Sequence, residues 1–151
     1  MKRVFSALLL IPFLAFTQNY TRTLELGIPK SGLEPKNINF STDAIYVGEK
    51  KCFNYIKKTD VIINNETVPN YFEIISLDDT VLFSGIIKKN ESGNFESTIN
   101  FHPIKKLYKN SKIIGRNDLI LNLSSNQVLN NNCSLDIKNL ELFYQKSNEN
   151  N

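Results

Sequence analysis

The clearest pattern of hydrophobic and polar positions lies in the segment Phe95–Phe101. Phe95, Ser97, Ile99 and Phe101 fall on one side of it, and Glu96, Thr98 and Asn100 fall on the other. A period of two residues is typical of a strand with one buried and one solvated face. This segment therefore predicts a strand in a sheet that is covered on one side only.

Two segments before it, 71–77 and 80–88, are rich in β-branched and aromatic residues and also predict strands. Asp78-Asp79 forms the turn between them, and residues 90–94 form the turn before the next strand. Turns this short cannot accommodate a parallel crossover, so the three strands predict an antiparallel meander. Upstream, residues 44–57 predict a hairpin around Gly48-Glu49-Lys50.

The hydrophobic pattern changes in the C-terminal third of the chain. Residues 118–129 predict a helix capped by Asn117, with Leu119 and Leu123 on its apolar face. Because Leu119, Leu121 and Leu123 also alternate, a strand remains the other interpretation of this segment. The sequence alone leaves the two open.

Leu140, Leu142 and Tyr144 alternate and predict a final strand before the polar tail 147–151. The sum is an α+β fold: an antiparallel β-meander of five or six strands with one helix packed on a face. We expect it to form a single domain over residues 41–146.

The N-terminus predicts a cleaved signal peptide over residues 1–17. Lys2 and Arg3 precede an apolar stretch of 13 residues, Val4–Phe16, which is too short to span a bilayer because a spanning helix needs about 20 residues. Ala15-Phe16-Thr17 is close to the small-x-small cleavage pattern, which places the mature start at Gln18. Residues 18–40 then predict a poorly ordered or edge-strand lead-in.

The net charge limits the classes of binding partner that the sequence supports. The chain holds 18 basic and 15 acidic residues, and removal of Lys2 and Arg3 with the signal leaves 16 against 15, a net charge of +1. A near-neutral protein gives no argument for nucleic acid. One stretch, 97–117, carries no acidic residue, and its cations are a candidate binding patch for an anionic glycan, a lipid headgroup or an acidic partner: Lys105, Lys106, Lys109, Lys112 and Arg116. The ordinary alternative is a solvated face.

Cys52 and Cys133 are the two cysteines. In an oxidising compartment a bridge between them would close a loop of about 80 residues, worth roughly 4 kcal/mol in the chain-entropy description. Two buried thiols are the other possibility. Their spacing excludes CxxC redox chemistry and a cysteine-only zinc site. With His102 as the single histidine, and without a phosphate-binding glycine loop, no residue pattern calls for a metal or a cofactor.

Catalytic candidates are few. Asp78, Asp79 or Asp118, together with Arg116, are the groups from which a carboxylate-based hydrolase could be built, if two of them converge in a pocket. Aspartates in a hairpin turn are usually turn formers, and Arg116 before Asp118 is usually a loop-to-helix junction. His102 lies at a strand end without a recognisable nucleophile.

Three strings carry a resemblance to small exported bacterial envelope proteins: Ala15-Phe16-Thr17-Gln18, Ser76–Leu82 and Ile113–Asp118. The resemblance implies export to the periplasm or extracellular space, and it transfers no functional residue. The resulting hypothesis is an exported non-enzymatic binding or structural module. The alternatives are the small secreted hydrolase and an inhibitor or immunity-type protein that acts through a loop, with residues 58–70 as the candidate loop.

Overall fold

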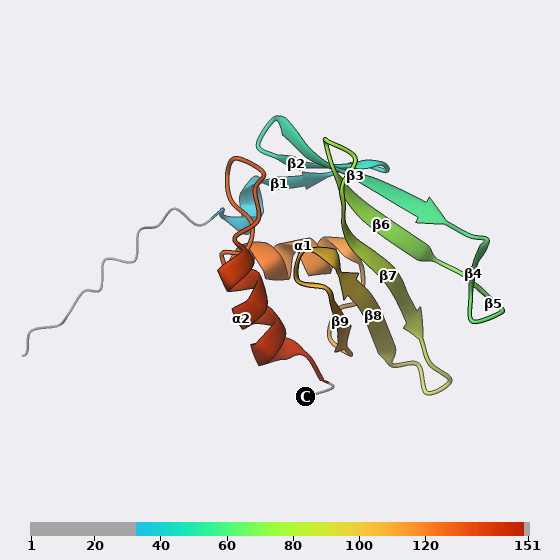
Figure 1. Ribbon diagram of the computed structural model, residues 1–151. Coiled ribbons are helices and arrows are strands. Elements are labelled where there is room, and N and C mark those ends of the chain that lie inside the picture. The colour runs from blue at the N-terminus through green and yellow to red at the C-terminus, as the bar shows by residue number, and fades with distance from the viewer. Residues whose placement is uncertain (1–32, 150–151) are drawn as a thin grey trace, which may run out of the picture.

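The computed structural model describes residues 33–149 (Figure 1). The predicted signal peptide, and the alternating Leu24, Leu26 and Ile28 of the lead-in, lie outside the described residues. Within them the fold is α+β, with an antiparallel main sheet and two helices.

The main sheet has seven strands in the order β1-β2-β3-β6-β7-β8-β9, and every neighbouring pair is antiparallel. The strands are β1 (Ile38–Phe40), β2 (Ala44–Val47), β3 (Lys50–Lys58), β6 (Tyr71–Ser76), β7 (Val81–Lys89), β8 (Phe95–Phe101) and β9 (Lys106–Asn110). The prediction of five or six strands was therefore too low. It missed β1, which falls in the predicted lead-in 18–40, and β9, because the lysines of β9 obscure its alternation.

A second, two-stranded sheet projects from the end of β3 and β6 (Figure 1). It consists of β4 (Val61–Ile63) and β5 (Glu66–Val68), and we call it the β4–β5 ribbon. Asn64 and Asn65 form its tip with φ of 51° and 65°. Two successive residues in the left-handed region define a tight hairpin turn whose twist matches that of the strands.

The predicted meander is present in β6, β7 and β8. Alternation in β8 is confirmed, since Ser97, Ile99 and Phe101 are buried while Glu96 and Asn100 are exposed. 

A glycine fixes the close approach of β7 and β8. A Cβ atom on Gly85 would lie 2.1 Å from the carbonyl oxygen of Thr98. Real Cβ atoms do not approach a backbone oxygen so closely, so any side chain here would push the two strands apart.

Helix α1 (Arg116–Ser125) settles the choice between helix and strand for residues 118–129. Its N-cap is Gly115, two residues before the predicted Asn117, and the Asp118 carboxylate accepts the Ile114 N–H at 3.1 Å. The helix ends earlier than predicted because Gln127 adopts φ 57°. The following Val128 N–H then bonds the Leu123 carbonyl, which closes a Schellman turn.

The predicted final strand is wrong: residues 137–147 form helix α2 (Ile137–Ser147). Asp136 caps it by accepting the Asn139 N–H at 2.9 Å. The alternation of Leu140 with Leu142 was misleading, because Leu142 is 53% exposed. The buried residues of the helix are Leu140 and Phe143, which lie three positions apart and therefore on one face of the helix.

Both helices pack on one face of the sheet (Figure 1), and an aromatic cluster joins α2 to it. The Phe101 and Tyr108 rings stack with centroids 4.7 Å apart, and Phe143 of α2 lies 5.6 Å from Tyr108. Leu119 and Leu123 of α1 belong to the same core and are fully buried. Such edge and stacked ring contacts add to the free energy gained from apolar burial.

The open edge of β9 is covered by the residues that follow α2. Lys109 N–H donates to the Asn148 side-chain oxygen at 2.8 Å, and Glu149 N–H donates to the Lys109 carbonyl at 2.9 Å. Tyr144 O–H donates to the Leu107 carbonyl at 3.3 Å. This edge is therefore unavailable to strands of another chain.

Cys52 of β3 and Cys133 of the α1–α2 connection form a disulfide, with Cα atoms 5.1 Å apart. Of the two alternatives left open by the sequence, the bridge is the one observed. It ties the connection between the helices to β3.

Candidate functional site

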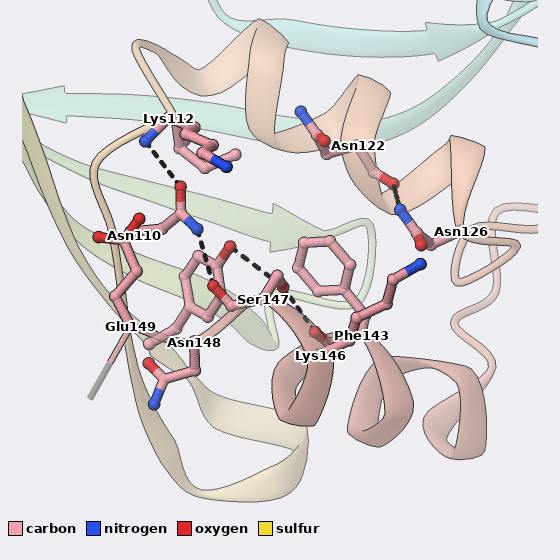
Figure 2. Close-up of a pocket in the computed structure, with 11 residues that line it drawn as sticks. Asn110, Lys112, Asn122, Asn126, Phe143, Lys146, Ser147, Asn148 and Glu149 are labelled. Carbon is pink, nitrogen blue, oxygen red and sulfur yellow. Dashed lines mark hydrogen bonds between the residues drawn. The ribbon is translucent and has the colours of Figure 1, made fainter. Parts of the chain in front are cut away.

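A cleft of about 380 Å³ lies between α1, α2 and the C-terminal end of β9, and we call it the interhelical cleft (Figure 2). Asn122 and Asn126 reach it from α1, while Phe143 and Lys146 reach it from α2. Its full lining is Tyr108, Asn110, Lys112, Ile113, Asn122, Asn126, Phe143, Lys146, Ser147, Asn148 and Glu149.

Hydrogen bonds fix one wall of this cleft. The Asn110 side-chain N–H donates to the Ser147 carbonyl at 2.7 Å, and its oxygen accepts the Lys112 N–H at 2.7 Å. Tyr108 O–H donates to the Ser147 hydroxyl at 3.3 Å. Burial raises the pKa of Tyr108 above its usual value, although the bond to Ser147 acts in the opposite direction. Tyr108 is therefore a neutral, fixed part of the wall.

Other lining residues offer side-chain groups without internal partners. Within residues 33–149, the ammonium groups of Lys112 and Lys146 make no ion pair or hydrogen bond. The side-chain oxygens of Asn122 and Asn126 accept no hydrogen bond from the described chain, since only their N–H groups are engaged. Glu149 differs, because Ser111 donates two bonds of 2.8 Å to its carboxylate.

A second cleft of about 440 Å³, the His102 cleft, lies where the β6–β7 turn meets the α1–α2 connection. Its walls are largely apolar, with Leu82, Pro103 and Leu135 among them. His102 Nε2 lies 2.7 Å from the Ser84 hydroxyl. Because Ser84 is only 1% exposed, it orients the imidazole and is out of reach of a substrate as a nucleophile.

The structure separates the five predicted binding cations. Lys112 lies at the interhelical cleft. Lys106 lies over the Tyr144 ring at 4.9 Å, and the backbone of Lys109 holds the β9 edge. Lys105 occupies a left-handed turn before β9. Of the five, only Lys112 reaches the cleft.

Arg116 has a structural role. Its guanidinium stacks on the Tyr55 ring at 3.8 Å from the centroid and donates to the Thr42 and Ser41 carbonyls. Burial raises the pKa of Tyr55, and the charge of Arg116 partly offsets this rise. The arginine thus joins the start of α1 to β3 and to the β1–β2 turn.

The carboxylate candidates do not line a common cleft. Asp78 lines the His102 cleft without Arg116 or Asp118. Its carboxylate accepts bonds from the Ser76 hydroxyl and from Thr80 N–H, and the Ser76 bond is the main reason why the Asp78 pKa is lowered. Asp79 adopts φ 64° in the same turn, as a turn former does.

The β4–β5 ribbon corresponds to the loop candidate 58–70, and it is an ordered hairpin. Ile62 is 69% exposed and Ile63 40% exposed. β4 pairs only with β5, so the outer edges of both strands lack a strand partner within the described chain. Among the large hydrophobic side chains of residues 33–149, that of Ile62 is the most exposed, and Ile63 adjoins it on the same projecting hairpin.

Comparison with known proteins returned no match: no protein family, no curated protein and no solved structure resembles this chain at a significant level. Within residues 33–149, no helix is long and apolar enough to cross a membrane. The same residues hold no cluster of three or more side chains suited to a metal ion.

Sequence reasoning missed the interhelical cleft. Its lining comes from β9, α1 and α2, and α2 had been predicted as a strand. The available signal was the spacing of Leu140, Phe143 and Tyr144 behind the Asp136 cap, which indicates a helical face.

Proposed function

We propose that this chain is an exported, non-enzymatic binding protein that contacts a partner protein through its β4–β5 ribbon. The observation that carries the proposal is the exposure of Ile62, 69%, at an ordered hairpin that projects from the sheet. Burying such a side chain against a partner contributes about 1.5–3 kcal/mol, which the isolated chain forgoes.

The ribbon is suited to a protein partner for two reasons. Its outer strand edges present unpaired backbone groups, which can add to the sheet of another chain. Asp60 precedes β4, and Glu66 lies beside the tip, opposite Ile63. Carboxylates at this position oppose insertion into an anionic lipid surface, whereas a protein pocket with a polar rim accommodates them.

Export is supported by two features. The Cys52–Cys133 bridge is typical of an oxidising compartment, and Lys2, Arg3 and the apolar stretch after them have the pattern of a signal peptide. We place the protein in the periplasm or the extracellular space on this basis.

The test compares Ile62→Asp with Ile114→Asp, a matched change at an isoleucine that is 57% exposed but lies before α1. Tagged wild-type and variant proteins would be incubated with the exported fraction of the native host. Any partner retained would be purified and titrated calorimetrically. We expect one-to-one binding that Ile62→Asp weakens at least thirtyfold, the effect of losing an interface hot spot of about 2 kcal/mol.

Both variants should keep the wild-type free energy of unfolding within about 0.5 kcal/mol, because both side chains are exposed. Two outcomes would contradict the proposal: no partner retained by the wild type, or equal affinity of the partner for the wild type and Ile62→Asp.

A further inference from the structure

The interhelical cleft lies apart from the ribbon and combines three kinds of group that bear on a ligand. Two ammonium groups, from Lys112 and Lys146, reach it without partners within residues 33–149. The side-chain oxygens of Asn122 and Asn126 add acceptors. Its volume of about 380 Å³ falls in the range of small-molecule sites, about 300–1,000 Å³.

The floor of the cleft is rigid and apolar. Tyr108 is fully buried, and Ile113 and Phe143 are only 3% and 4% exposed. Because these side chains have almost no accessible surface, a ligand finds its contacts at the polar groups around them. The ligand therefore has polar groups that match amides and lysines.

The helix ends at the cleft limit the negative charge that the ligand can carry. The cleft is lined by the second half of α1, through Asn122 and Asn126, and by the last turns of α2, through Phe143 to Ser147. The C-terminal end of a helix carries partial negative charge, which disfavours a multiply charged anion such as a phosphate ester. Two lysine ammonium groups still favour one negative charge.

We propose that the interhelical cleft binds a small carboxylated sugar of the uronic acid class. Its carboxylate pairs with the ammonium group of Lys112 or of Lys146, and its hydroxyl groups bond the amides of Asn122 and Asn126. Each hydroxyl group both donates and accepts, so it matches an amide side chain, which also offers both functions. The proposal is independent of the ribbon and its partner.

The experiment is an NMR titration of the disulfide-intact, isotopically labelled protein with sodium D-glucuronate. D-glucose tests the need for the carboxylate, and inorganic phosphate tests the preference for one charge. We expect saturable shifts at the amides of Asn122, Asn126 and Lys146, with a dissociation constant of about 1 mM, as the size of the ligand allows. Glucose and phosphate should bind at least tenfold more weakly.

Lys112→Gln combined with Lys146→Gln removes both charges, and we expect it to weaken glucuronate binding at least tenfold. The matched control is Lys105→Gln with Lys138→Gln, two exposed lysines outside the cleft lining, which should stay within twofold of the wild type. The same spectra report whether each variant is folded.

Shifts outside the cleft only, no saturation with glucuronate, or equal binding of glucose would each overturn the proposal. Tighter binding of phosphate, or an equal loss of affinity in the control pair, would do so as well. A trimer of galacturonate tests whether the natural ligand is the end of a glycan chain or a free sugar acid. Binding at least as tight as that of the monomer assigns the chain end, and weaker binding assigns the free acid.

Discussion

The outer edge of β9 and the outer edges of the β4–β5 ribbon are treated in opposite ways. At β9, residues after α2 return to the edge, and Asn148 and Glu149 bond the Lys109 backbone. At the β4–β5 ribbon, no strand of the described chain covers either outer edge, and Ile62 is exposed beside them. One edge is closed by the protein itself, and the other is left for an outside partner in the function proposed above.

This difference indicates that the β9 edge serves stability and that the ribbon edges are available for recognition. An uncovered apolar edge carries a risk of aggregation, and a protein normally protects it with charge, proline or a covering segment. The chain covers β9 in this way, with side chains from 38 or 39 residues away in the sequence. We therefore expect substitutions around β9 to act on folding and substitutions at the ribbon to act on binding.

The largest expected effect comes from the disulfide, which holds the helical half against the sheet. Replacing Cys52 and Cys133 together by alanine should lower the free energy of unfolding by about 4 kcal/mol, because the bridge closes a loop across 81 residues. Urea denaturation of the variant against the oxidised wild type measures this difference. If the free energy of unfolding falls by less than about 1 kcal/mol, the helices stay packed on the sheet without the bridge.

A smaller effect is expected at the covered edge itself. Asn148→Ala removes the acceptor of the Lys109 N–H and should cost about 1 kcal/mol. Because the edge is then uncovered, self-association should rise with concentration in sedimentation velocity. Asn131→Ala, at an exposed position of the α1–α2 connection, is the control and should remain monomeric to the same extent as the wild type. If the two variants self-associate to the same extent, Asn148 does not protect the β9 edge.

The smallest effect concerns alkaline pH. Burial raises the pKa of Tyr108, so the unfolded chain loses this proton first, near its usual value of about 10. Above that pH the folded state binds more protons than the unfolded state, and stability falls until the raised pKa is reached. Tyr108→Phe should flatten this fall in urea midpoints between neutral and alkaline pH. Tyr55, with its pKa also raised, leaves a residual slope.

In the Tyr108 experiment, Tyr71→Phe on the opposite face of the sheet is the control, and it should retain the wild-type slope. An unchanged slope in Tyr108→Phe would mean that this hydroxyl does not contribute to alkaline unfolding.

The meander was predictable because its signals are local. Phe95–Phe101 alternates, and Asp78-Asp79 supplies turn chemistry within a few residues. The ribbon was recognised only as a candidate loop, since its three-residue strands are too short to show a period. Helix α2 was missed because Leu140, Leu142 and Tyr144 alternate by chance, although Leu142 is exposed and the buried Phe143 lies between them.

The candidate site was harder to predict than the fold. The sequence placed a cationic patch on five residues that are close in the chain, but a cleft selects residues by their position in space. Lys112 lines the interhelical cleft together with Lys146 of α2, which is outside the predicted patch, while Arg116 stacks on Tyr55. No local pattern relates Lys112 to Lys146, because their proximity depends on how α2 packs against β9.

The span of the disulfide has a consequence for proteolysis. Cys52 precedes the β4–β5 ribbon and Cys133 follows α1, so the ribbon lies inside the covalent loop. A protease that cuts at the exposed tip, Asn64-Asn65, would leave two fragments that remain joined by the sulfur bridge. The cut protein would migrate as a single species until it is reduced, and its sheet could persist after the tip had been opened.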